Sequence, residues 1–114
     1  MANTFKVDTK SSLTTDAFTS ANTPVLTAGG TATLIVLSVL VSNKTGTSAD
    51  VDLYLVTNTG DDVYILRNVP VPAGSTLDAL DNSKLVMESS DVLHARCGTA
   101  SALDISVSYL EQTP

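Results

Sequence analysis

The sequence has no tryptophan, one cysteine, one histidine and few other aromatic residues. Two phenylalanines and three tyrosines are too few to fill a core, so the interior of this 114-residue chain has to be aliphatic. A single cysteine cannot close an internal disulfide, and one cysteine with one histidine cannot supply a Cys/His zinc site. The chain is long enough for one domain and too short for two.

Basic residues are also scarce, six against twelve acidic residues, which gives a net charge of −6. Because the lysines and arginines are scattered along the chain, we expect no patch that binds nucleic-acid phosphates. No apolar run reaches the roughly 18 residues of a membrane-spanning helix, so no membrane partner is expected. The polar start lacks the apolar segment of a signal peptide, which predicts a protein made and kept, or assembled, in a reducing cytosol.

The longest apolar run is TATLIVLSVLVS, at residues 31–42. Much of it consists of β-branched residues, which favour a strand over a helix, and polar turn residues follow at 43–46. Since its side chains are apolar at both odd and even positions, the run predicts a central strand buried on both faces. The cover could be a second layer of this chain or a neighbouring subunit.

Shorter segments with alternating polar and apolar residues occupy the rest of the chain. Turn residues separate them at intervals of about 8–12 residues, a spacing typical of sandwiches and barrels. We therefore predict an all-β fold, a single antiparallel β-sandwich of the jelly-roll or immunoglobulin-like type, with seven or eight short strands. The expected strands after the apolar run lie near 49–57, 63–69, 75–80, 84–87, 92–97 and 102–110.

The composition changes near residue 24. Residues 1–24 are rich in Thr, Ser and Asn and carry only a few separated apolar residues, so they cannot build a core of their own. We expect residues 1–24 to form an N-terminal arm or an edge strand, and residues 25–114 to form the β-sandwich domain. The alternative is that residues 3–9 form the first strand of the same sandwich. Phe5, Val7 and Phe18 are the predicted contacts of this segment with a partner.

Side chains that could carry catalysis are sparse. His94 and Cys97 are three residues apart on a predicted strand and point to opposite faces, so they cannot form a catalytic pair. Asp50, Asp52 and the carboxylates at 61–62 lack the ligand ladder of a dedicated calcium site and are interpreted as solvated turn residues. No phosphate-binding glycine loop occurs. The sequence predicts no catalytic, cofactor-binding or metal-binding residues, and a protein that is not an enzyme.

Four motifs follow the apolar run in a fixed order: VPVPAGSTL at 69–77, KLVME at 84–88, DVL at 91–93 and VSYLE at 107–111. In this order and spacing they resemble small β-sandwich virion proteins of tailed bacteriophages, over roughly residues 25–111. The resemblance implies a structural protein of the particle that is present in many copies, with no catalytic residues to carry over.

The resemblance leaves the position on the particle open between capsid surface, neck and tail. We favour a capsid decoration or cement protein that clamps neighbouring capsid subunits, located in the virion after assembly in the host cytoplasm. Its partners would be the major capsid protein or other virion proteins, and itself, as a homo-oligomer with a trimer preferred. Phe5, Val7 and Phe18 would make these oligomer or capsid contacts. The alternative is a neck or tail protein, including a carbohydrate- or receptor-binding sandwich, although sugar sites usually present more aromatic residues than this chain has.

Overall fold

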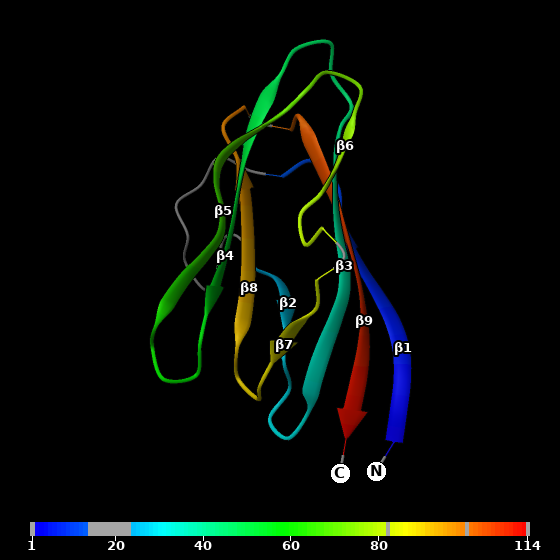
Figure 1. The fold of residues 1–114 in the computed structure, drawn as a ribbon, viewed down its shortest axis with the longest axis vertical. Helices are drawn as coiled ribbons and strands as arrows, with labels where there is room; N and C mark the ends of the chain where they lie inside the picture. Colours follow the sequence, from blue (N-terminus) through cyan, green and yellow to red (C-terminus); the bar gives the residue numbers. More distant parts are fainter. Residues whose placement is uncertain (1, 14–23, 82, 100, 114) are drawn as a thin grey trace.

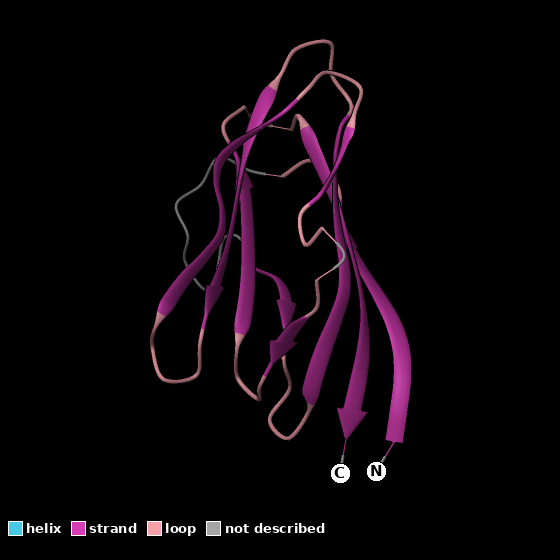
Figure 2. Ribbon diagram, in the orientation of Figure 1, coloured by secondary structure: helices cyan, strands magenta, loops and turns pink. Residues whose placement is uncertain are grey.

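The computed structural model describes residues 2–13, 24–81, 83–99 and 101–113, which form strands and turns without a helix (Figures 1 and 2). The described part of the chain therefore holds no helix that could cross a membrane. The strands are β1 (Ala2–Lys10), β2 (Pro24–Thr27), β3 (Thr33–Asn43), β4 (Ala49–Val56), β5 (Asp62–Val71), β6 (Thr76–Asp78), β7 (Leu85–Met87), β8 (Val92–Cys97) and β9 (Leu103–Thr113).

The strands form two antiparallel sheets that pack as a sandwich, as the spacing of the turns predicts. The five-stranded sheet has the order β1-β9-β3-β6, with β7 also paired to β3, and the four-stranded sheet has the order β2-β8-β4-β5. β6 pairs with residues 40–42 of β3 and β7 with residues 34–36, so together they occupy one position beside β3. With β6 and β7 counted as one, this interleaved order is that of a jelly roll.

The described residues form nine strands, or eight when β6 and β7 are counted as one, against the seven or eight expected. The strand that the sequence does not predict is β2, which has only four residues and begins at a proline. β2 lies at the edge of its sheet beside β8, and the register shifts directly after Pro24. A proline is tolerated there because an edge strand leaves one side of its backbone unpaired.

β3 is central, with β9 on one side and β6 and β7 on the other (Figure 1). Within the described residues only one of its two faces is buried, and cover of the other face by a neighbouring subunit stays a prediction. A β-bulge between Val36 and Ser38 shifts which residues of β3 point to the core, from even-numbered to odd-numbered positions. The second sheet covers one face only, and on the other face Ile35 is half-buried and Leu40 is exposed. The core-facing aliphatic residues of β3 are Leu34, Val36, Val39 and Val41.

The core between the sheets is aliphatic, as the composition predicts. Leu13, Leu53, Met87, Leu93 and Leu103 are among its fully buried side chains. Burial of each such side chain stabilises the fold by about 1.5–3 kcal/mol.

β1 joins the sandwich as an edge strand, and all nine of its residues pair with β9 without a register shift. Residues 14–23, which include Phe18, lie outside the described residues. The division of the chain at residue 24 therefore stays a prediction.

Candidate functional site

An apolar row crosses the outer face of the five-stranded sheet. Backbone pairing places Phe5 of β1 opposite Leu110 of β9, Leu110 opposite Ile35 of β3, and Ile35 opposite Val86 of β7. Directly paired residues point to the same side of a sheet. Since the chain neighbours of Leu110 and Ile35 face the core, these four side chains face outward, and we call them the outer row.

The two ends of the outer row are open to solvent. Phe5 is 77% exposed and Val86 is 55% exposed, whereas Ile35 and Leu110 between them are half-buried. Val7, two residues after Phe5 and on the same face of β1, is 58% exposed. Apolar side chains that are contiguous and exposed on a small protein mark an interaction surface, because covering them removes apolar area from water.

Two of the three contacts predicted from the sequence lie at the β1 end of this surface. Phe5 and Val7 are adjacent there, whereas Phe18 falls among the residues that the structure does not describe. Their role as contacts stays a prediction.

Three members of the outer row were not foreseen. Continued alternation along the last strand would have placed Leu110 outward. Ile35 is hidden in the sequence by the bulge of β3, and Val86 lies in a strand too short to show a pattern.

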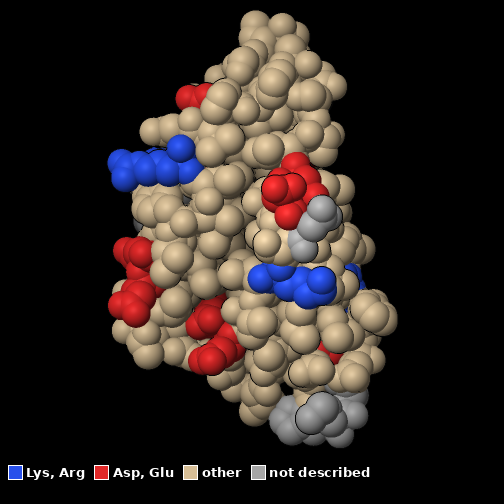
Figure 3. Space-filling model, viewed as in Figure 1, with Lys and Arg blue, Asp and Glu red and all other residues tan. Residues whose placement is uncertain are grey.

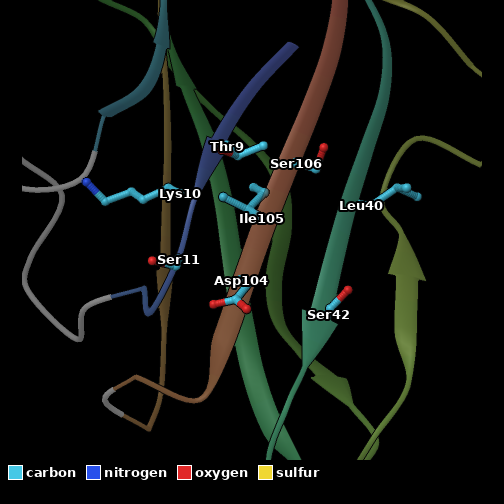
Figure 4. A pocket seen from close by; sticks show the side chains of 8 residues that line it. All are labelled: Thr9, Lys10, Ser11, Leu40, Ser42, Asp104, Ile105 and Ser106. Atoms are coloured by element: carbon cyan, nitrogen blue, oxygen red, sulfur yellow. The ribbon is translucent and has the colours of Figure 1, made fainter.

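A shallow depression of about 440 Å³ lies on the same sheet, where β1, β9 and β3 run side by side (Figure 4). Hydroxyl groups from Thr9, Ser42 and Ser106 line it, together with Asp104. The Asp104 carboxylate accepts hydrogen bonds from Lys44 Nζ at 2.9 Å and from the Ser12 N–H at 2.7 Å. These two bonds hold the pKa of Asp104 below its usual value. The carboxylate is therefore a fixed anion near neutral pH rather than a proton carrier.

A different group of side chains lies on the outer face of the four-stranded sheet. The ring centroids of Tyr54 and Tyr64 are 5.1 Å apart, and the Arg67 guanidinium lies 5.3 Å from the centroid of the Tyr64 ring. Burial raises the pKa of Tyr54, and the neighbouring charge of Asp62 raises it further. Tyr64 is 44% exposed, so this pair presents an aromatic surface beside a cation.

Asp52, one of the four carboxylates considered for calcium binding, is buried within β4 and is not the solvated turn residue that the sequence suggested. Asp52 accepts hydrogen bonds from Arg96 Nε at 2.9 Å and from the Asn68 N–H at 2.6 Å. Cys97 faces the core, and His94 lies on the opposite face of β8. Among the described residues, no three His, Cys, Asp or Glu side chains come close enough to hold a metal ion.

The described residues thus present two surfaces suited to binding, an apolar one and an aromatic one. On the face drawn in Figure 3 the basic groups lie apart from one another, and most of the surface is uncharged.

No family model matches the sequence, and no curated protein matches it.

Proposed function

We propose that the protein is a structural component of a tailed-bacteriophage particle, and specifically a capsid decoration or cement protein that stabilises contacts between capsid subunits. The phage assignment comes from the resemblance of the four motifs at 69–111. The observation that carries the binding role is the outer row, which ends in Phe5 at 77% exposure and Val86 at 55% exposure. An apolar surface of this kind is stabilised when another protein covers it.

The proposal names the partners and the place of the protein. It sits in the virion after assembly in the host cytoplasm, on the major capsid protein or another virion protein, and needs neither a cofactor nor catalytic residues. It also associates with itself, and the resemblance implies a trimer. Jelly-roll sandwiches occur in viral capsid domains and in lectins, so the fold alone is compatible with this role and with sugar binding.

The test combines localisation with binding. Cryo-electron microscopy of particles should place the protein on the outside of the capsid, and the purified protein should bind capsids that lack it. Phe5→Ser and Val86→Ser each remove apolar area from the outer row and should weaken capsid binding about tenfold or more. Tyr64→Ser, on the opposite face of the sandwich, should bind like the wild type. Equal binding by all variants, or a position inside the particle, would contradict the proposal.

The second candidate function is a neck or tail protein with a carbohydrate- or receptor-binding surface. It is favoured by the Tyr54–Tyr64 pair with Arg67 beside it, because sugar rings stack on exposed aromatic faces. On a glycan array the wild type should then bind a sugar, Tyr64→Ala should not, and Phe5→Ser should bind unchanged. An array without any signal for the wild type rules out the carbohydrate form of this function.

A further inference from the structure

The sandwich has one long and regular edge. β2, β6 and β7 have three or four residues each, and β5 is broken by two register shifts and contains Pro70. β1 pairs with β9 over nine residues without a shift, and among the described strands it pairs with nothing on its other side (Figure 1). Short or bulged edges resist further pairing, whereas a long regular edge is a template for another strand.

The residues of β1 whose backbone groups face that edge can be deduced from hydrogen bonds in the middle of the sheet. The C=O of Val39 and the N–H of Asn43 each form a 2.9 Å hydrogen bond with the chain segment on the β6 side of β3. Successive residues of an antiparallel strand bond to opposite sides, so Leu40 and Ser42 bond to β9.

The same alternation continues across β9. The partners of Leu40 and Ser42 there are Ser106 and Asp104, which bond back to β3. The intervening residue Ile105 and the next one, Val107, therefore bond to β1, where they pair with even-numbered residues. The odd-numbered residues of β1 turn their N–H and C=O groups to the free edge.

We propose that β1 pairs antiparallel with β1 of a second copy of the protein, about a two-fold axis at Val7, so that the two five-stranded sheets become one. The outward N–H and C=O groups of Phe5, Val7 and Thr9 then bond to the partner. In this register Val7 opposes Val7 of the partner subunit, Phe5 opposes the partner's Thr9, and Lys6 opposes the partner's Asp8.

The charges on β1 select this register among its neighbours. With the axis at Val7, both copies of Lys6 meet an opposite charge, at positions where the side chains of a pair come closest. Moving the axis to Lys6 sets Lys6 against Lys6 of the partner subunit, and moving it to Asp8 sets like carboxylates against each other. Moving it to Phe5 leaves Lys6 opposite the partner's Thr4. An axis at Thr9 also opposes Asp8 and the partner's Lys10, but it pairs only residues 8–10 of β1, whereas the axis at Val7 pairs residues 4–10. Lysines usually protect an edge from pairing, but here they leave an attractive register along the longer ladder.

The side chains on the outer face agree with this pairing. Phe5 lies diagonal to the partner's Val7, so the β1 ends of both outer rows meet at the axis and cover each other. On the other face, Lys6 Nζ bonds to Glu111 of β9 at 2.9 Å, so the partner's Asp8 would add a second carboxylate to an existing ion pair. This inference is independent of the phage assignment, and it replaces the trimer implied by the resemblance with a two-fold dimer of the free protein.

Disulfide trapping in the full chain tests the register. In Val7→Cys the paired Cα atoms would lie about 5.5 Å apart, which suits a disulfide. We expect mild oxidation to give a covalent dimer on a non-reducing gel. Phe5→Cys is the matched control, because its two sulfurs would lie four residues out of register, more than about 13 Å apart. Cross-linking through Phe5→Cys, through both variants or through neither would overturn the proposal.

Sedimentation tests the dimer itself. The wild type should sediment as a dimer at micromolar concentration, and Asp8→Lys should weaken the dimer about tenfold or more, because it sets lysines against lysines. Mixing Asp8→Lys with Lys6→Asp should restore a mixed dimer, since every opposed pair then has opposite charges. Thermal melts of each variant report that it is folded. A wild-type monomer or trimer, or an Asp8→Lys dimer as tight as the wild type, would overturn the proposal.

Discussion

At the scale of single residues, polar side chains form hydrogen bonds that stabilise the ends of strands. Asn43, 3% exposed at the end of β3, donates from Nδ2 to the C=O groups of Thr47 and Val71 at 2.8 and 2.9 Å. Its Oδ1 accepts from the Thr45 N–H at 2.9 Å. A buried amide with all these partners stabilises one loop conformation, because leaving any of them unpaired would be costly. Asp104 acts in the same way nearer the surface, through Lys44 and Ser12.

The low pKa of Asp104 makes part of the stability depend on pH. Its folded pKa lies below the ordinary value of 3.8, so the ionised carboxylate stabilises the fold above about pH 4. That contribution is lost as the pH falls through the folded pKa. Asp104→Asn should lower the melting temperature near neutral pH and flatten its decline in acid. Lys44→Met removes the basic partner of the same ion pair and should have the same two effects on the melting temperature. Melting curves between about pH 6 and pH 2 that match the wild type in both variants would contradict this.

At the scale of elements, the sequence predicts where the strands lie better than it predicts which of their alternating residues point to the core. On β9 the alternation rule places Leu103, Ile105 and Val107 in the core, where the structure has them. On β3 every position around residues 34–37 is apolar, so the extra residue of the bulge leaves no mark in the pattern. Ile35 of the outer row was missed for the same reason, and Val86 was missed because β7 is too short to show a pattern. Phe5 and Val7 were found because they stand alone in a polar segment.

The phase of β3 predicts opposite outcomes for two adjacent substitutions. Val39→Asp places an unpaired charge at a fully buried position, which costs several kcal/mol out of a total stability of about 6–17 kcal/mol. We expect its melting temperature to fall by more than about 10 °C. Leu40→Asp, on the outward face at 39% exposure, should fold and melt close to the wild type. Circular dichroism melts measure both variants. If the bulge were absent, Leu40→Asp would have the lower melting temperature of the two.

At the scale of the whole molecule, the two outer faces of the sandwich differ. One carries the apolar outer row and the free edge of β1, and the other carries the Tyr54–Tyr64 pair. The core connects them but depends little on β1, whose described side chains are exposed apart from the half-buried Lys10. It does depend on Leu13, which is fully buried just beyond β1.

Stepwise deletion should separate these contributions. A chain that lacks residues 1–10 should still fold cooperatively, with a lower melting temperature from the lost ladder, and should be monomeric. Removing residues 1–13 also deletes the buried Leu13 side chain and should cost roughly 2–5 kcal/mol more. Denaturant titration measures the step between the two truncations. Equal stability of both, or an intact dimer after the shorter deletion, would contradict this view of the segment.

The pairing of the first strand with the last also has a consequence in time. Ala2 pairs with Thr113, so the start of β1 and the end of β9 lie side by side in Figure 1. During synthesis at about 5–20 residues per second, β1 emerges roughly 5–20 s before β9 is available. Throughout that interval both of its edges are open, and Phe5 and Val7 are unprotected. On a crowded polysome the first strand of one nascent chain can therefore pair with the last strand of a completed neighbour whose own first strand has not yet docked, which makes strand exchange the expected misfolding route of this topology.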